Sequence, residues 1–415
     1  MTTSPGLPTR AVVGPGWLVR VLAVTQTVGY GVLYYAFSVI LGPMSADLGI
    51  PYTTAAGALT VAVLVSGLLS IPVGRWLDAR DGHGLMTLGS AVGSVAVLGW
   101  SQVHNAVQLY GVFVLIGVAS AMVLYEPAFA VVVAATEPAR RAKALLGITL
   151  VAGFASSIFI PLTGQLVDRI AWRPALVTLA ILLAALSVPL HGIGLRRTST
   201  AGRHTRRHRA SLTWVLRDPA FWLLAATFVL HGAALAVVAV HLVQYLISLG
   251  HPAVVAATLA GLLGLLSVTG RVVTTLSTRW LPMATIVGSI LVGQGVAMSL
   301  LPVLGRHLFG AIACLVLFGL GFGVASIATP AILLERYGAT GYGTIAGTLA
   351  APILIAKATA PLGGALFAAA LGYRSLVLLV ATACAVAGLL LFVVQRLPTD
   401  APATRFCGRL RVADT

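Results

Sequence analysis

Residues 220–247 read AFWLLAATFVLHGAALAVVAVHLVQYLI, without one Asp, Glu, Lys or Arg. A second run, residues 376–394, reads LVLLVATACAVAGLLLFVV. About 20 consecutive apolar residues are what a helix needs to cross the hydrocarbon core of a bilayer. A helix also satisfies all of its backbone hydrogen bonds internally, which lipid requires of any spanning segment. Both runs therefore predict membrane-spanning helices.

The composition extends this prediction to the whole chain. Of the 415 residues, 59% are hydrophobic and 9% are charged, and the mean hydropathy is +1.00. A soluble globular domain carries roughly 25% charged residues. The sequence therefore predicts an all-α membrane protein. We expect twelve transmembrane helices, over residues 17–41, 53–77, 85–103, 106–135, 144–167, 173–195, 219–248, 253–278, 283–303, 307–334, 341–370 and 374–396.

The basic residues predict the orientation, because cytoplasmic loops are enriched in Lys and Arg. With twelve spans, 20 of the 26 Lys and Arg residues fall on the side of the two termini. Four fall on the other side, and Arg271 and Lys357 lie within spans. We therefore expect a multi-pass protein of the cell inner membrane with both termini in the cytoplasm. The net charge of +16 follows this topology, and no nucleic-acid partner is expected.

The longest polar stretch, residues 196–218, reads RRTSTAGRHTRRHRASLTWVLRD and divides the spans into six and six. It is either a topogenic linker or a segment that contacts anionic lipid or has a regulatory role. The predicted parts are an N-terminal six-helix bundle, a cytoplasmic basic linker, a C-terminal six-helix bundle and a cytoplasmic tail. Their bounds are 1–195, 196–218, 219–396 and 397–415.

The two halves share a weak repeat. The fifth span ends PLTGQLVDRIAWRPALVTL, from Pro161, and the eleventh ends PLGGALFAAALGYRSLVLL, from Pro361. Two parallel six-helix repeats place a substrate path at their interface, near the middle of the membrane. The sequence therefore predicts two pseudo-symmetric bundles around a central site.

The loop after the second span, GRWLDARDGHG from residue 74, resembles a signature of the major facilitator superfamily, Gly-x-x-x-Asp-Arg-x-Gly-Arg/Lys. Gly74 and Asp78 match, Arg80 stands one place late, and His83 stands where a cation is usual. This resemblance covers essentially the whole chain and implies the major facilitator fold. It also implies a cytoplasmic gate formed by Gly74, Asp78, Arg80, Arg140 and Arg141.

Within that superfamily, HLVQYLISLG (241–250) and GLLGLLSVTGR (261–271) look like spans seven and eight of the monocarboxylate and oxalate/formate antiporter branch. The resemblance implies that Arg271 and Lys357 bind the carboxylate groups of a substrate. It also implies a cavity lined by aromatic side chains, for which the candidates are Tyr30, Tyr34, Tyr35 and Tyr125.

Three ionisable side chains lie deep within spans: Glu126, Arg271 and Lys357. Each costs at least ~2.5 kcal/mol to insert at mid-membrane, so each needs a partner, an aqueous cavity or a function. The planar guanidinium of Arg271 is suited to bind a substrate carboxylate. The alternative role of Arg271 is a structural bridge to Glu126. Lys357 either contacts substrate or pairs with Glu126 or a backbone carbonyl. Glu126 carries a coupled proton, forms a static bridge, or recognises a cationic substrate.

Other chemistry is absent from the sequence. There is no Walker lysine for ATP hydrolysis, and Cys314, Cys384 and Cys407 have no metal-ligand spacing. We therefore expect no enzyme activity, no cofactor and no metal.

The expected function is secondary active transport of a small organic anion, a mono- or dicarboxylate, by alternating access with proton or exchange coupling. A proton-driven exporter of drugs or lipophilic metabolites is the alternative. A membrane sensor or intramembrane enzyme would need a larger soluble domain or a catalytic cluster. The expected partners are the substrate and membrane lipid, and the expected state is a monomer.

Overall fold

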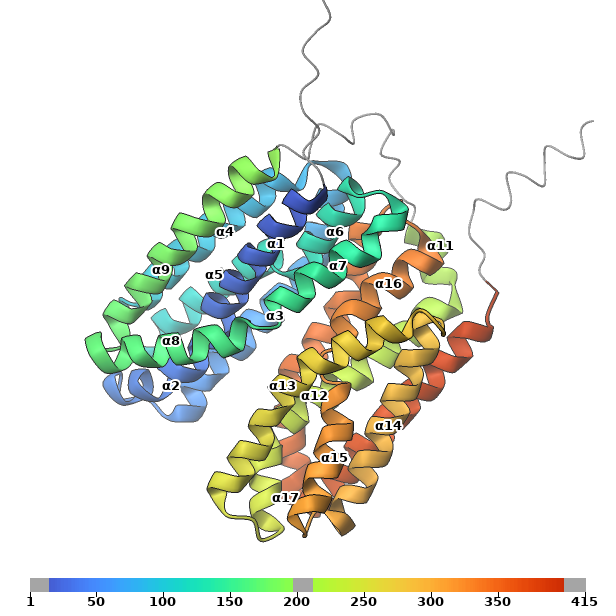
Figure 1. Ribbon diagram of the computed structural model, residues 1–415. Helices are drawn as coiled ribbons and strands as arrows, with labels where there is room; N and C mark the ends of the chain where they lie inside the picture. Colours follow the sequence, from blue (N-terminus) through green and yellow to red (C-terminus); the bar gives the residue numbers. More distant parts are fainter. Residues whose placement is uncertain (1–14, 197–211, 399–415) are drawn as a thin grey trace, which may run out of the picture.

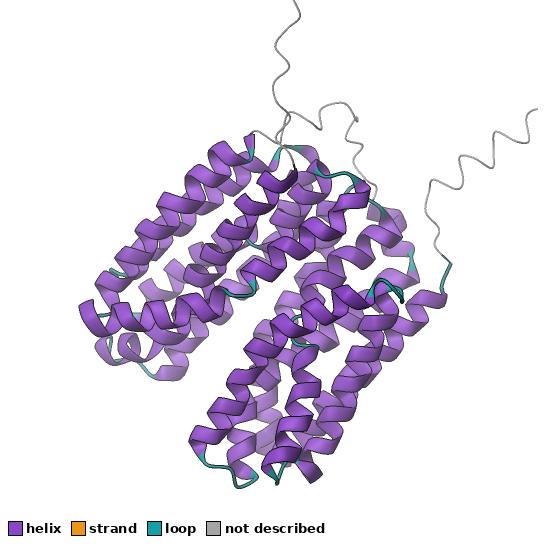
Figure 2. Ribbon diagram, viewed as in Figure 1, coloured by secondary structure: helices purple, strands orange, loops and turns teal. Residues whose placement is uncertain are grey.

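A computed structural model describes residues 15–196 and 212–398 as helices joined by short connections, with no strand in these two ranges (Figure 2). Most of the predicted basic linker, residues 197–211, lies outside the described residues. The same holds for residues 1–14 and for the tail from residue 399. The described chain forms two bundles, residues 15–196 and 212–398, which lie side by side (Figure 1).

The N-terminal bundle contains six spans, several of them built from two helical segments. Its elements are α1 (Pro15–Tyr30), the π-helix η1 (Gly31–Tyr35), α2 (Ala36–Asp47), α3 (Tyr52–Ala79), α4 (Gly82–Trp100), α5 (Ala106–Val123), α6 (Tyr125–Ala135), α7 (Pro138–Ala152), α8 (Ala155–Ile170), α9 (Trp172–Pro189) and the π-helix η2 (Leu190–Gly194). Large side chains fill its core, and the rings of Trp100 and Phe113 pack edge to face with centroids 5.0 Å apart.

The C-terminal bundle follows a short helix, α11 (Leu212–Arg217). Its elements are α12 (Pro219–Ser248), α13 (Ala253–Ser277), α14 (Met283–Leu304), α15 (Leu308–Leu320), α16 (Ala325–Tyr337) and α17 (Tyr342–Arg396). The last is 55 residues long, about twice what one crossing requires. Gly372, with φ 83° and ψ 159°, breaks α17 into two spans.

The described residues contain eleven continuous apolar helical stretches that are long enough to cross a membrane. Dividing α17 at Gly372 gives twelve spans, six in each bundle. The all-α, two-bundle fold predicted from the sequence is therefore confirmed.

The fifth span differs from its predicted bounds. It runs over Pro138–Ile170, whereas the sequence predicted residues 144–167. Pro138 is the first residue of α7. A backbone N–H at this position would have no partner within the helix, so its absence in proline costs nothing, and the fixed φ of proline suits a helix. Arg140 and Arg141 therefore lie in the first turns of a helix and not in the preceding loop.

The two bundles lie closest together at one end of the molecule and diverge toward the other (Figure 1). We call the first end the basic end; α1 and α7 begin there, and the end of α3 meets the start of α17 there. The second is called the opposite end. At the basic end α3 packs on α17, because both helices present residues with no bulky side chain. A Cβ on Gly74 would lie 2.1 Å from the Gly343 carbonyl oxygen, and one on Gly347 would lie 2.2 Å from the Ser70 carbonyl oxygen.

Candidate functional site

Four spans are interrupted near their middle. The first contains η1, the fourth changes direction at Leu124, the fifth ends one helix at Gly153, and the tenth is interrupted over residues 321–324. A helix break leaves backbone carbonyl groups without their usual partners. Deviations of this kind also cluster at functional sites. The breaks therefore mark a layer between the basic end and the opposite end where polar side chains find acceptors.

Glu126 lies at the break of the fourth span, in the first turn of α6. Its neighbour Tyr125 stacks on Phe129, with centroids 5.0 Å apart, and packs against Tyr30 at 4.6 Å. Glu126 interacts electrostatically with Tyr30, with Tyr342 at the start of α17, and with Lys357. The N-terminal bundle thus presents one carboxyl group within an aromatic cluster.

Lys357 lies in the middle of the first half of α17, and its side chain is exposed. Its methylene stem rests on Gly232 of α12, where a Cβ would lie 3.1 Å from Cε and 3.3 Å from Cγ. Lys357 interacts electrostatically with Glu126 and with His231. Between residues that the structure describes, it makes neither a hydrogen bond nor an ion pair. Its ammonium group is therefore available to a ligand.

Arg271 of α13 is only 9% exposed. Its Nε donates to the Gly323 carbonyl oxygen at 3.2 Å, and its Nη1 donates to the Thr149 carbonyl oxygen at 3.1 Å. These bonds use two of the five N–H groups of a guanidinium. Arg271 also interacts electrostatically with Tyr35 and Tyr125. Tyr125 therefore lies within electrostatic range of both the acid of the N-terminal bundle and the arginine of the C-terminal bundle.

The contact at the basic end is built around Asp78, at the end of α3. Its carboxylate accepts hydrogen bonds from the backbone N–H groups of Gly343 and Thr344, at 2.9 and 2.7 Å, and from the Thr344 hydroxyl at 2.5 Å. Asp78 thus lies at the N-terminus of α17, where the helix dipole favours a negative charge. Ser70 adds a hydrogen bond to the Gly347 carbonyl oxygen at 2.8 Å.

The model of the Major Facilitator Superfamily matches residues 23–353. The chain belongs to this superfamily. The likeness covers both bundles, Glu126 and Arg271, and it ends just before Lys357. The resemblance to the superfamily is therefore confirmed, whereas its monocarboxylate and oxalate/formate branch stays a prediction.

Solved structures of other transporters share the superfamily fold. The human organic anion transporter MFSD10 (TETRAN) matches with a TM-score of 0.73 at 14% identity, over 91% of this chain and all of that one. The E. coli fucose:proton symporter FucP matches with a TM-score of 0.72 at 15% identity, over 94% and 100%. A bacterial homologue of the iron transporter ferroportin, in an outward-facing state, matches with 0.73 at 15%, over 92% and 100%. A search of the curated proteins finds no match. At these identities the likeness shows the fold alone.

The structure brings some of the predicted superfamily site together and leaves other parts apart. Tyr30 and Tyr125 pack together and both interact electrostatically with Glu126, but Tyr34 is 42% exposed and packs on Tyr35, with centroids 5.3 Å apart. The two static bridges considered for Glu126, to Arg271 and to Lys357, are not among the ion pairs of the described residues.

Three of the five predicted gating residues have their partners within the N-terminal bundle in this conformation. The Arg80 guanidinium lies over the ring of Trp76 on its own helix, 4.1 Å from the centroid. Arg141 donates to the Thr136 carbonyl oxygen, and Arg140 forms a loose, exposed pair with Glu137 at 3.9 Å. Of these five residues, Gly74 and Asp78 meet the C-terminal bundle: Gly74 lies against the Gly343 backbone, and Asp78 accepts a hydrogen bond from the Gly343 backbone N–H.

Sequence reasoning missed a neutral polar chain beside Lys357. His231 Nε2 and Gln294 Oε1 are 3.0 Å apart, and Gln294 Nε2 donates to the Phe318 carbonyl oxygen at 2.7 Å. This bond satisfies a carbonyl at the end of α15, near the break of the tenth span. The available signal was an amide and an imidazole in otherwise apolar spans, which is weaker than the signal of a full charge.

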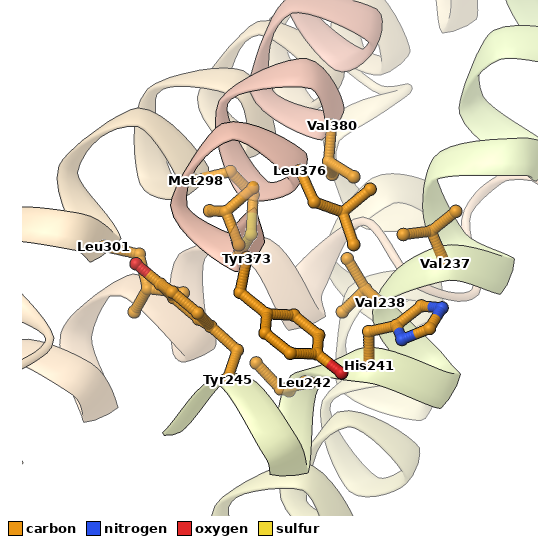
Figure 3. A pocket seen from close by; sticks show the side chains of 11 residues that line it. Val237, Val238, His241, Leu242, Tyr245, Met298, Leu301, Tyr373, Leu376 and Val380 are labelled. Atoms are coloured by element: carbon orange, nitrogen blue, oxygen red, sulfur yellow. The ribbon is translucent and has the colours of Figure 1, made fainter. Parts of the chain in front are cut away.

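Figure 3 shows a cavity inside the C-terminal bundle, between α12, α14 and the second half of α17. Its volume is about 20 Å³, enough for roughly one water molecule. Apolar side chains line most of it, and the Tyr245 hydroxyl is buried without a hydrogen-bond partner among the described residues. This cavity is too small for an organic substrate, so we do not assign it to the transport site.

Proposed function

We propose that this protein is a secondary active transporter of a small organic anion, a mono- or dicarboxylate. The observation that carries the proposal is Lys357, an exposed residue halfway along a membrane-spanning helix that forms no ion pair with an acid of the described residues. A cation in that position is costly unless water or an anion reaches it. A carboxylate entering between the bundles would supply the missing partner.

The other groups have complementary roles in this proposal. Arg271 retains N–H groups that can donate to the same anion, and Tyr30, Tyr34 and Tyr125 provide aromatic surface and hydroxyl donors. Glu126 interacts with Lys357 and competes with the substrate for it, so protonation of Glu126 would favour anion binding. Coupling to protons, or exchange of one anion for another, would follow from that competition.

The orientation follows from the basic residues, with the basic end in the cytoplasm of a cell whose inner membrane holds the protein. In that orientation the described conformation is outward-facing, because the hydrogen bonds of Asp78 and Ser70 close the cytoplasmic end. One chain contains both bundles, so a monomer suffices for alternating access. Gating at the cytoplasmic end would involve Gly74 and Asp78, with Arg80, Arg140 and Arg141 engaging in other conformations.

The test is uptake of a panel of radiolabelled organic acids into proteoliposomes, with and without a pH gradient. Lys357→Ala removes a charge-assisted hydrogen bond worth ~1.5–3 kcal/mol, so the KM of a transported acid should rise about 10- to 150-fold. Arg271→Ala should abolish uptake while membrane insertion stays normal. Lys143→Ala removes the other lysine of the chain, which is exposed on α7, and should leave uptake unchanged. Normal uptake in Lys357→Ala would refute the anion site.

A second candidate is a proton-driven exporter of drugs or lipophilic metabolites, with lipophilic cations as the class that Glu126 would bind. The observation that favours it is Glu126 beside the packed rings of Tyr30, Tyr125 and Phe129, since aromatic faces attract organic cations. Thermal stabilisation of the purified protein discriminates between the two candidates. Stabilisation by carboxylates supports the first, and stabilisation by lipophilic cations, lost in Glu126→Gln, supports the second.

A further inference from the structure

The described residues contain three places where a side-chain hydrogen bond joins the two bundles. Two of them, at Asp78 and Ser70, connect α3 to α17. The third is the bond from Arg271 Nη1 of α13 to the Thr149 carbonyl oxygen of α7, on a different pair of helices. Arg271 also binds the Gly323 carbonyl oxygen of its own bundle. One guanidinium thus bridges a helix break in each bundle.

The space for this guanidinium is provided by two glycines. A Cβ on Gly153 would lie 2.2 Å from Arg271 Nη1, and one on Gly323 would lie 2.7 Å from Arg271 Nε and also 2.6 Å from the Ser267 carbonyl oxygen of α13. Gly153 has an ordinary helical conformation, φ −60° and ψ −25°, so the backbone itself does not require a glycine there. The absent side chain matters because it leaves room for the bond to Thr149.

The Thr149 carbonyl is an acceptor suited to a contact that forms and breaks. It also accepts from the backbone N–H of Gly153, at 3.0 Å, so it keeps a partner after Arg271 leaves. A guanidinium bound to a carbonyl oxygen makes a charge-assisted hydrogen bond but no ion pair. Breaking it therefore leaves no unpaired acid behind in the membrane, in contrast to breaking a buried salt bridge.

We propose that Arg271 is a latch that holds α13 against α7 in the conformation with the basic end closed. The latch is released when the bundles rock, because α7 and α13 belong to different bundles and Thr149 moves away from the guanidinium. This inference rests on the alternating access of the proposed function but not on the identity of the substrate. It gives Arg271 a role in conformational equilibrium in addition to any contact with an anion.

The experiment measures the distance between the two bundles at the opposite end. Val107→Cys in α5 and Val254→Cys in α13 provide labelling sites there, since these side chains are 83% and 80% exposed. Cys314, Cys384 and Cys407 are replaced by Ala. Spin labels on the full chain in lipid nanodiscs, without added organic acid, then report the populations of long and short distances. The variants are Arg271→Ala, Gly153→Ala and Gly323→Ala.

Gly153→Ala is the decisive variant, because it keeps the positive charge and displaces only the guanidinium. We expect Arg271→Ala and Gly153→Ala each to shift the population ratio toward the short distance by roughly tenfold, equivalent to 1.4 kcal/mol. Gly323→Ala should also shorten the distance, but its Cβ would meet the Ser267 backbone of α13 as well as the guanidinium, so Gly153→Ala is the variant that isolates the latch. The matched control is Gly164→Ala in the same span, where a Cβ would meet nothing within 4 Å, and it should match the parent protein.

A wild-type distance distribution in Gly153→Ala would overturn the latch, whatever Arg271→Ala does. If Arg271→Ala does not fold, Gly153→Ala decides alone. The distances do not depend on transport, so a failure to find a transported acid would refute the proposed function and leave the latch standing. A shift in distance with normal uptake of an acid in Arg271→Ala would keep the latch and remove Arg271 from the anion site.

Discussion

Among the described residues, ion pairs occur within the bundles, whereas the side-chain hydrogen bonds between the bundles have at most one charged partner. The N-terminal bundle contains an ion pair between Arg173 and Asp47, 3.0 Å apart, and the C-terminal bundle contains one between Arg336 and Asp218 at the same distance. Across the interface, by contrast, Asp78 binds neutral N–H and hydroxyl groups, and Arg271 binds a carbonyl oxygen. Each charged group that joins the bundles therefore has an uncharged partner.

This difference is informative because a transporter must break one set of contacts in every cycle and keep the other. Separating an ion pair leaves two charges without partners, whereas breaking a bond between a charge and a dipole leaves only one, so the second kind of bond is exchanged for water at lower cost. The pattern indicates that each bundle moves as a unit and that the interface is the part that opens. Substitutions in the two regions should then have separable effects, on conformation for the interface and on stability for the bundles.

The largest effect is expected from Gly74→Ala. The new Cβ would lie 2.1 Å from the Gly343 carbonyl oxygen, and backbone cannot move aside as a flexible side chain can. The basic end could then not close, so uptake of a transported acid should be lost and the label distance at the opposite end should shorten. The control is Gly84→Ala at the same end, where a Cβ meets nothing within 4 Å. Unchanged uptake in Gly74→Ala would show that this contact is not needed for transport.

Asp78→Asn should have the next largest effect. The asparagine keeps one acceptor oxygen but loses the charge that faces the N-terminus of α17, and hydrogen bonds to charged groups are worth ~1.5–3 kcal/mol. The distance populations should therefore shift about 10- to 150-fold away from the conformation with the basic end closed. Asp47→Asn, which weakens an ion pair inside one bundle, should leave the populations unchanged. Equal shifts in both variants would contradict the distinction between interface and bundle.

Much of the fold could be predicted from the sequence, because lipid leaves a spanning segment few alternatives to an apolar helix. The apolar runs at 220–247 and 376–394 each form a membrane-spanning helix, and the observed bounds differ from the predicted ones by a few residues. The breaks inside spans were not predicted. The break beside Gly153 lies next to a guanidinium from the other bundle, which the local sequence does not reveal, and η1 begins at Gly31, one of many glycines within the apolar spans.

The site was partly predictable for a related reason. Glu126, Arg271 and Lys357 stand out because a charge in hydrocarbon needs an explanation. Their partners do not stand out, since Arg271 binds backbone carbonyls and the stem of Lys357 rests on a glycine. Backbone carbonyl groups and a glycine have no distinctive side chain, so these partners cannot be identified from the sequence. His231 and Gln294 are neutral, so their bond became evident only when the structure brought α12 and α14 together.

Arg336→Ala tests whether an ion pair inside a bundle contributes to stability without affecting the conformational equilibrium. Arg336 binds Asp218 and also donates to the Pro398 carbonyl oxygen at 3.1 Å, so it ties α16 to α12 and to the end of α17. We expect a loss of ~1–2 kcal/mol in stability, measured by thermal unfolding in detergent, with unchanged distance populations. Arg140→Ala is the matched control, because both side chains of its pair are mostly exposed. A shift in the distance populations of Arg336→Ala would place this pair in the moving interface.

The smallest effect is the pH dependence of Asp218, which lies at the basic end outside the spans. Burial alone would raise the pKa of its carboxyl, but hydrogen bonds from Arg336, the Ala220 backbone N–H and Tyr337 outweigh burial and lower the pKa. A lowered pKa means that the folded state prefers the carboxylate, so these bonds stabilise the protein above the ordinary pKa of 3.8 and are lost as the pH falls through the lower, folded value.

The wild-type protein should therefore be more stable than Asp218→Asn at about pH 7, by on the order of 1 kcal/mol or less for a pair this close to solvent. That gap should close as the pH falls below about 4, because the protonated acid and the amide make similar bonds. Thermal unfolding of both proteins over this range measures the gap, and groups common to both cancel in the difference. A stability difference that stays constant or widens in acid would mean that Asp218 is not held as a carboxylate. The C-terminal bundle would then no longer provide an example of a charged pair inside a bundle, in contrast to the uncharged partners between the bundles.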